Sequence, residues 1–298
     1  MVLASGIDIV TGVEDINPNR LDTASHRGQA RRTVYFSVAH PETGIRISCS
    51  LTDSEPGAVT MRHHHVFEQV RYICAGNVYF GQHKYPPGTL IYTPESVYYG
   101  PQARREATRI LAFQFPGPSN LMPLSLRQLP EEEFARGLSE LRAAGVSFEG
   151  GVARFPNGKK QEPAEAIYEH LAGRALTYAP PRYADPIYMQ TPQFPWCPTN
   201  QPGVRVKHLA YFNEGGPNLT MVRLEPGATM PGGHSRCFDI RVVLEGDVQY
   251  GGQTCPAVSR LYFPPDSAFE PLSTHNGAEL LVFQIAAPDG PAPSRELF

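Results

Sequence analysis

Two histidines separated by a single residue are the side chains of this sequence best suited to hold a metal ion. His63 and His65 lie in the segment HHHVFEQ, Gln69 follows four residues after His65, and Gly57 and Gly76 flank the segment. In a strand, residues i and i+2 point to the same side, so both imidazoles would face the same space. Gln69, on the next strand after a tight turn, would add an oxygen donor. Such a set suits Fe, Mn, Ni, Cu or Zn and leaves room for water or substrate.

A plainer interpretation of these histidines stays open. Three consecutive histidines can form the exposed polar end of a strand, and a His-x-His pair is common by chance. The positions of Gly57 and Gly76 favour the metal or small-ligand site. His64 should point away from its neighbours and be structural or exposed.

Two arginines share the parity of the candidate ligands. Arg71 lies two residues after Gln69, and Arg241 holds a similar position in the second half of the chain. A charge that faces a barrel interior is costly unless it is paired. Arg71 could therefore anchor a carboxylate or phenolate of a substrate. An internal ion pair, such as Arg241 with Glu270, is the alternative.

The elements that position these residues occur twice. EPGAVTM at residues 55–61 returns as EPGATM at 225–230, GNVYFG at 76–81 as GDVQYG at 246–251, and RILAFQF at 109–115 as ELLVFQI at 279–285. All three pairs share the same offset along the chain. Each half alternates apolar and polar residues between Pro-Gly, Gly-Gln and Pro-Asp turns, which is typical of β-strands. A duplicated β-unit is therefore expected.

The segment between the two copies has a different character. A helix is expected from the Pro130 region to Gly145 and a second one from Pro163 to Gly173. Residues 178–202 are rich in proline and aromatic residues and should form an extended strap. We therefore predict an N-terminal barrel over 1–128, a helical and Pro-rich connector over 129–203, and a C-terminal barrel over 204–298.

Composition narrows the class of protein. The net charge is −3 and no long Lys/Arg block occurs, so neither nucleic acid nor an anionic membrane is expected as a partner. The start of the chain has no secretory pattern, and no apolar run approaches the roughly 20 residues of a membrane span. The five scattered cysteines form no C-x-x-C pair. A soluble cytoplasmic protein with reduced thiols and a small-molecule substrate is expected, and a homodimer stays open.

The spacing Gly57-x5-His63-x-His65-x3-Gln69-x6-Gly76 resembles the first signature motif of the cupin superfamily, in which the position of Gln69 is usually Glu. Residues 86–102 resemble the second motif, where Gly88 and Pro94 fit and Tyr99 stands in place of a metal-binding His. The resemblance covers roughly residues 35–116 and 205–286. It implies an all-β fold of two double-stranded β-helix (jelly-roll) barrels in tandem.

The resemblance also implies a site in the N-terminal barrel. The expected metal ligands are His63, His65, Gln69 and Tyr99, with Tyr99 alternatively a hydrogen-bond donor or a space-filling ring. Tyr99 and Arg71 are the expected catalytic residues that orient the substrate. Tyr79 and Phe113, on neighbouring strands, are candidate pocket walls, with core packing as the alternative.

The second copy retains less of this set. His65 corresponds to His234, His63 to Gly232, Gln69 to Asp239 and Tyr99 to Glu270. One imidazole and two acids are more often the remnant of a lost site, so no metal is expected in the C-terminal barrel.

These features favour a metal-dependent enzyme that acts on a small organic, possibly aromatic, substrate. A dioxygenase with a divalent transition metal is the first choice, with iron preferred over Mn, Ni, Cu or Zn. A metal-dependent lyase, isomerase or cyclase fits the same residues. A non-catalytic small-molecule-binding protein of two cupin barrels is the competing class.

Overall fold

The computed structural model of the chain describes residues 2–3, 8–10, 32–39, 44, 46–125, 129–287 and 289–294. They divide into two compact units. One unit contains strand β2 (Asp8–Val10) and the residues from Thr191 onward, and the other contains the residues from 45 to 190. The predicted connector is thereby divided near residue 190, and its helices belong to the N-terminal unit.

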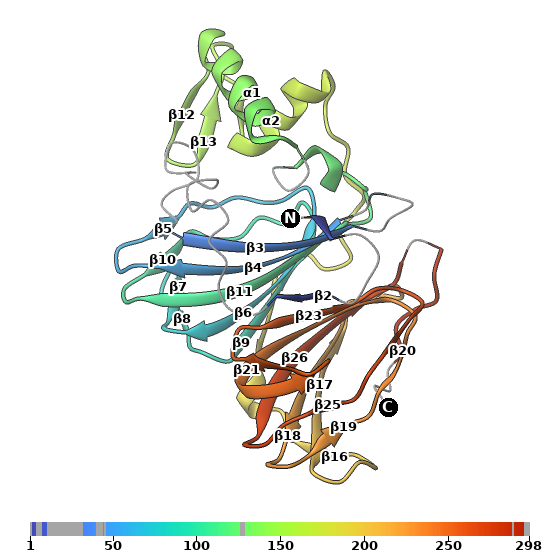
Figure 1. The fold of residues 1–298 in the computed structure, drawn as a ribbon. Helices are drawn as coiled ribbons and strands as arrows, with labels where there is room; N and C mark the ends of the chain where they lie inside the picture. Colours follow the sequence, from blue (N-terminus) through green and yellow to red (C-terminus); the bar gives the residue numbers. More distant parts are fainter. Residues whose placement is uncertain are drawn as a thin grey trace. The chain divides into compact units, whose positions relative to one another are not determined.

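The N-terminal unit is built on two antiparallel sheets (Figure 1). Its apolar core includes Ile73, Ile91 and Ile110 from the larger sheet and Val78 from the smaller one, so the core lies between the sheets. The larger sheet has the order β3 (Arg32–Ala39), β4 (Arg46–Ser54), β11 (Thr108–Phe115), β6 (Glu68–Ala75), β9 (Thr89–Thr93) and β15 (Ile187–Gln190). The smaller has the order β5 (Val59–Thr60), β10 (Gln102–Arg104), β7 (Val78–Phe80) and β8 (His83–Tyr85), and β1 (Val2–Leu3) precedes both in the chain.

A helical layer covers one end of this unit (Figure 1). Both helices lie where the sequence predicts them, and three glutamates occupy the first turn of α1, where they favour the positive end of the helix dipole. Helix α2 ends at Gly173, which has a φ of 64°. The layer has its own apolar core, to which Val66 and Phe67 contribute from the segment that follows the histidines. Its elements are η1 (Met122–Leu124), α1 (Glu131–Ala143), β12 (Ser147–Glu149), β13 (Val152–Arg154), β14 (Lys160–Gln161) and α2 (Pro163–Ala172).

The C-terminal unit repeats the two-sheet plan around a core of its own. Its main sheet has the order β16 (Cys197–Pro198), β17 (Val204–Tyr211), β18 (Asn218–Leu224), β26 (Ala278–Ile285), β21 (Phe238–Tyr250), β23 (Arg260–Phe263) and β2. The remaining elements are η2 (Thr191–Gln193), β19 (Thr229–Met230), β20 (Gly233–Ser235), β22 (Gln253–Pro256), β24 (Ser267–Phe269) and β25 (Leu272–Ser273).

Equivalent glycines show that the two barrels are copies of one design. Gly76 and Gly246 have φ values of +67° and +72°, in the left-handed region that favours glycine. A Cβ on either residue would lie 2.1 Å from a backbone oxygen, that of Ala107 in one copy and of Gly277 in the other. The same close approach therefore recurs at the corresponding position of the second copy. The predicted all-β architecture of two tandem barrels is confirmed.

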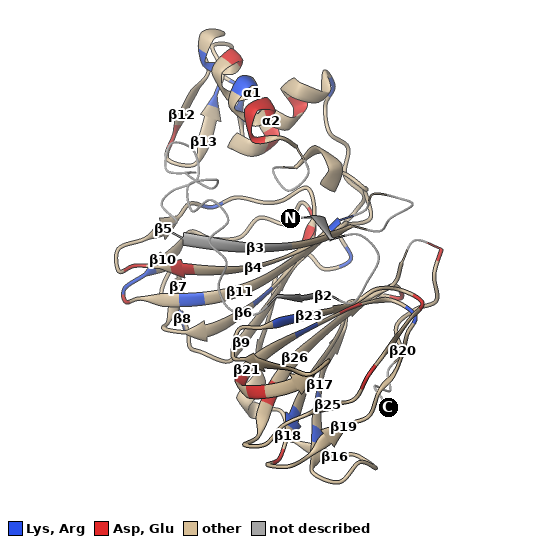
Figure 2. Ribbon diagram, in the orientation of Figure 1, with Lys and Arg blue, Asp and Glu red and all other residues tan. Residues whose placement is uncertain are grey.

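Charge is distributed without a dominant sign over the described residues. Lys and Arg are interspersed with Asp and Glu on both units and on α1, whereas α2 carries Glu but no Lys or Arg (Figure 2). Among these residues, no helix combines the length and the apolar character that crossing a membrane requires.

Candidate functional site

Backbone pairing brings the second predicted motif against the first. The amide of His63 donates to the carbonyl of Tyr99 over 3.1 Å, and the amide of Tyr99 donates back over 3.0 Å. The amide of Ser96 donates to the carbonyl of His65 over 2.9 Å. The histidine segment and the Tyr99 segment therefore form a short antiparallel pair at one end of the barrel.

Sheet register then brings strand β6 into the same site. Gln69 lies opposite Gln114 of β11 and Thr93 of β9, and Arg71 lies opposite Ala112 of β11. Directly paired residues of an antiparallel sheet project to the same face, and residues i and i+2 do so as well. All five side chains therefore share one face of the sheet.

All four predicted metal ligands, His63, His65, Gln69 and Tyr99, lie close together on this side of the sheet. The His63 and His65 ring centroids are 4.9 Å apart, and the His63 and Tyr99 centroids are 4.5 Å apart. The Tyr99 hydroxyl lies 2.6 Å from Nε2 of His65 and 3.3 Å from Oε1 of Gln69. All four residues are buried, each with 7% or less of its surface exposed.

The hydrogen bonds of this cluster determine which nitrogen could ligate. Nδ1 of His63 lies 2.7 Å from the carbonyl oxygen of Met61, which can only accept, so Nδ1 carries the proton and Nε2 the lone pair. A backbone carbonyl commonly orients a metal-binding imidazole in this way. Nε2 of His65 and Oε1 of Gln69 both approach the Tyr99 hydroxyl, whose single proton can serve only one of them at a time.

His64 points away from this cluster, as expected from its parity. Its Nε2 lies 2.8 Å from Oε2 of Glu165 on helix α2. His64 therefore links the histidine segment to the helical layer, which is a structural role.

Two buried arginines border the cluster. Nη1 of Arg71 donates to Oε1 of Gln102 over 2.7 Å, and its guanidinium lies 4.6 Å from the centre of the Tyr99 ring. Arg104 donates to the same amide oxygen over 3.3 Å and to Oγ1 of Thr60 over 2.9 Å. Burial, and next the charge of Arg71, lower the pKa of Arg104 to about 10. The site is therefore electropositive.

The two candidate pocket walls, Tyr79 and Phe113, do not face the cluster, and Phe113 takes the core position that was the alternative. Tyr79 lies under the guanidinium of Arg105, 4.1 Å from its ring centre, and Arg105 is exposed. Phe113 pairs with Val70, so it projects to the face opposite Gln69 and Arg71. Parity explains both errors, since each residue is one position out of phase with the inward-facing residues of its strand.

Other aromatic residues, which sequence reasoning missed, lie on the same side of the sheets as Arg71 and Gln102. The ring of Phe80 lies 5.7 Å from the guanidinium of Arg71. Tyr188, from the Pro-rich strap, pairs with Ile91 and stacks on Tyr85 at 4.5 Å. Burial, with Tyr85 next to it, raises the pKa of Tyr188 to about 12. Only the extension of strand parity from β6 to β10 and β7 could have indicated Gln102, Arg104 and Phe80, and no sequence signal assigned β15 to this sheet.

The C-terminal copy has a different polar interior. Asp239 accepts both Nε and Nη2 of Arg241, over 3.0 and 2.8 Å, and Nε2 of Gln284. The suggested partner of Arg241 was Glu270, which is wrong: the ion pair is formed with Asp239 on the same strand. His234 is exposed, so the one imidazole of this copy does not join a buried cluster.

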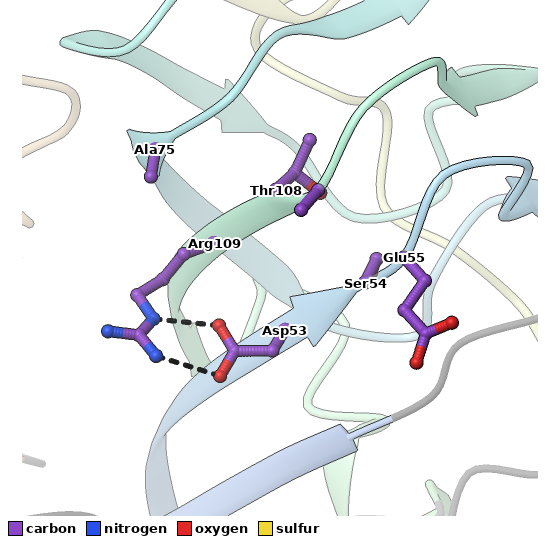
Figure 3. A pocket seen from close by; sticks show the side chains of 7 residues that line it. Asp53, Ser54, Glu55, Ala75, Thr108 and Arg109 are labelled. Atoms are coloured by element: carbon purple, nitrogen blue, oxygen red, sulfur yellow. Dashed lines mark hydrogen bonds and ion pairs between the residues drawn. The ribbon is translucent and has the colours of Figure 1, made fainter.

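A surface pocket of about 580 Å³ lies apart from these residues, at the ends of β4 and β11 (Figure 3). Its charged groups include Asp53 and Arg109, which form a two-point ion pair at 2.7 and 2.9 Å. The carboxylate and the guanidinium of this pair therefore already have each other as partners. Its lining is Asp53, Ser54, Glu55, Ala75, Ala107, Thr108 and Arg109.

Comparisons with known proteins agree with this architecture. Residues 184–287 match the family model of the ChrR cupin-like domain. A candidate dioxygenase from Nostoc punctiforme superposes with a TM-score of 0.60 at 10% identity, over 99% of this chain and 89% of that one. The chain has the cupin fold. The predicted resemblance to the cupin superfamily is thereby confirmed.

Two further structures resemble this chain. A candidate glyoxylate-induced protein from Pseudomonas aeruginosa has a TM-score of 0.53 at 10% identity, over 88% of this chain and 83% of that one. Oxalate decarboxylase from Bacillus subtilis has a TM-score of 0.50 at 14% identity, over 88% and 73%. No curated protein matches the chain in sequence. At sequence identities this low, the similarity shows a shared fold and nothing about activity.

The donor set of the N-terminal barrel fits a weakly held transition metal. Among the described residues, no three His, Cys, Asp or Glu side chains cluster as a metal site would require. The two imidazoles would therefore be completed by a neutral amide oxygen and a phenol or phenolate. Nitrogen and oxygen donors of this kind suit first-row metals, but without a carboxylate they attract a dication less strongly.

Proposed function

We propose that the N-terminal barrel holds a divalent transition metal on His63 and His65 and transforms a small organic substrate beside it. The observation that supports this most directly is the convergence of both imidazoles with the Gln69 amide and the Tyr99 hydroxyl in a buried barrel interior. Oxygen-dependent dioxygenase chemistry is the first choice, because the similar structures reported above include a candidate dioxygenase. That analogy concerns the fold and leaves a lyase reaction as the runner-up.

The chain's own residues divide the work of binding and orientation. His63 and His65, with Gln69 as an oxygen donor, would hold the metal, which when bound supplies Lewis-acid and redox chemistry. The Tyr99 hydroxyl bridges His65 and Gln69 and would donate a hydrogen bond to, or accept one from, a substrate oxygen. Arg71, packed over the Tyr99 ring, would fix the charged end of the substrate.

A second candidate function is a binding protein without catalysis. It is favoured by the absence of an acidic ligand among the described residues of the cluster and by the two guanidinium groups, which raise the cost of a nearby dication. In that case the barrel would hold an anionic metabolite and no metal.

Metal analysis of matched variants separates these functions. The metal content of purified protein, before and after chelation and reloading, is compared for wild type, His63→Ala and His234→Ala. The proposal expects His63→Ala to lose most of the bound metal and His234→Ala to keep it, because only His63 belongs to a buried cluster. A wild type that stays metal-free after reloading, or equal loss in both variants, would contradict the proposal.

A further inference from the structure

Equivalent arginines in the two barrels have different hydrogen-bond partners. Arg71 and Arg241 occupy equivalent positions of the repeat, following Gln69 and Asp239 respectively with one residue between. In the C-terminal barrel, Nε and Nη2 of Arg241 form a two-point bond to the Asp239 carboxylate. In the N-terminal barrel this carboxylate is replaced by the Gln69 amide, whose oxygen accepts from Tyr99 instead.

The same edge of Arg71 consequently has no acceptor. Arg71 is only 6% exposed, yet its Nε and Nη2 have no hydrogen-bond partner in the described part of the chain. These are the two atoms with which Arg241 holds its carboxylate. Nε of Arg104, in a side chain that is 7% exposed, also lacks an acceptor. Buried donors are nearly always satisfied, so three such atoms around one interior point to a missing acceptor.

The residues around Arg71 are also more polar or more charged than the corresponding residues around Arg241. Arg104 and Thr274 are equivalent, because their amides donate to the carbonyls of Ala58 and Ala228, which correspond in the repeat. Gln102 pairs with Thr60 in the first copy, where Leu272 pairs with Met230 in the second. The N-terminal barrel therefore has a second cation and polar neighbours at these places, whereas the C-terminal barrel has an uncharged Thr274 and the apolar Leu272 and Met230.

We propose that Arg71 and Arg104 bind the carboxylate of a small organic acid in the N-terminal barrel, with the two-point edge of Arg71 taking the place that it has on Asp239 in the second copy. A carboxylate has two oxygens that accept about four hydrogen bonds, enough for the three unsatisfied donors. The rings of Tyr99 and Phe80 against Arg71 would contact the apolar part of such an acid. The inference names the substrate class of the proposed enzyme and rests on that proposal for the place where the acid reacts.

The test uses the full chain, stripped of metal with chelator, and measures binding by calorimetry. The probes are acetate, propionate and benzoate, with acetamide, propionamide and benzamide as uncharged controls of matched shape. Wild type should bind at least one carboxylate and none of the amides. Arg71→Met and Arg104→Met should each weaken that binding about tenfold to hundredfold, the range expected for loss of a charge-assisted hydrogen bond.

Two more variants make the result specific. Gln69→Asp recreates the acid of the C-terminal barrel, so its carboxylate should occupy Arg71 and abolish probe binding. Arg105→Met removes an exposed charge from the neighbouring position and should bind as wild type does. Carboxylates that bind no better than their amides, or that bind Gln69→Asp and both buried-arginine variants as tightly as wild type, would overturn the inference.

The outcomes also separate this inference from the proposed function. Carboxylate binding in a protein that takes up no metal would retain the acid site and refute the metal enzyme. Metal uptake that depends on His63, without selective carboxylate binding, would do the reverse.

Discussion

Replacement of Arg104 by methionine should stabilise the ligand-free protein, although it removes a buried side chain that makes hydrogen bonds. Burial and the charge of Arg71 lower the pKa of Arg104 by more than two units, to about 10. At about 1.4 kcal/mol per pKa unit, the folded state carries a penalty of about 3 kcal/mol for keeping this group charged. The penalty is fully present at pH 7, because the group remains protonated there.

The hydrogen bonds of Arg104 offset part of this gain. It donates to Thr60 and to the side chain of Gln102, and each such bond contributes about 1 kcal/mol net. Methionine retains much of the apolar stem, so little packing is lost. The expected net effect is a gain of about 1 kcal/mol, or about 2 °C in Tm for a chain of this size.

A bound carboxylate should instead stabilise wild type more than Arg104→Met. A carboxylate at a hundred times its Kd stabilises the protein that binds it by about 2.7 kcal/mol. Wild type should therefore gain about 5 °C with saturating probe, while Arg104→Met, whose Kd is raised, should gain much less at the same concentration. Thermal unfolding with and without benzoate, or whichever probe carboxylate binds wild type, measures both effects.

Arg105→Met is the matched control, because it removes one positive charge from the adjacent residue at an exposed position. Its stability should stay within about 0.5 kcal/mol of wild type, and its response to the carboxylate should be unchanged. If Arg104→Met instead lost about 2 °C or more without ligand, the guanidinium would be a structural group. A full ligand response in that variant would refute the role of Arg104 in binding.

Three further predictions concern pH, metal affinity and the fold. Burial raises the pKa of Glu68 to about 7, despite its hydrogen bond with Tyr92, so ionisation costs stability as pH rises from about 4.5 through 7. Glu68→Gln should match metal-free wild type at pH 4 and exceed it by up to about 3 kcal/mol at pH 8 in urea unfolding; a difference independent of pH would contradict this. In the Arg71→Met background, where no guanidinium competes for the new carboxylate, Gln69→Glu should tighten metal binding at least tenfold in a competition titration, whereas unchanged affinity there would exclude Gln69 as a ligand. Gly76→Ala should destabilise the protein by several kcal/mol and Gly81→Ala, where a Cβ meets nothing within 4 Å, by only about 1; equal losses would mean that the close approach at Gly76 relaxes freely.

The sequence predicted well what depends on short-range periodicity. Parity put His63, His65, Gln69 and Arg71 on one face, and the repeated glycines and turns indicated two copies of one β-unit. Parity also failed where the phase of a strand was not known, as at Tyr79 and Phe113, which project away from the site. A shift of one residue reverses the face of every side chain on a strand, so pocket walls cannot be assigned without register.

Longer-range pairing was beyond the sequence for a different reason. The placement of Tyr188 beside Tyr85 depends on β15 joining β9, which lies far away along the chain, and no local pattern specifies that partner. The pairing of Arg241 with Asp239 rather than Glu270 likewise depends on side-chain conformations, which spacing alone does not determine.

Arg71 and Arg241 have different partners in the two barrels, and this difference affects how metal binding and substrate binding would be coupled. A buried guanidinium needs an anion, and the C-terminal barrel supplies one from its own chain, so its arginine is neutralised whether or not a ligand is present. The N-terminal barrel has the neutral Gln69 in place of that aspartate and has Arg104 as a second cation. The electrostatic potential is therefore positive where His63 and His65 would hold a dication. A carboxylate bound between the two arginines cancels one of their two positive charges and so weakens this repulsion. It should therefore favour metal binding, and by linkage the metal should favour the carboxylate by the same factor. The two buried guanidinium groups lower the stability of the ligand-free protein. In return, the metal and the carboxylate would each bind tightly only when the other is present.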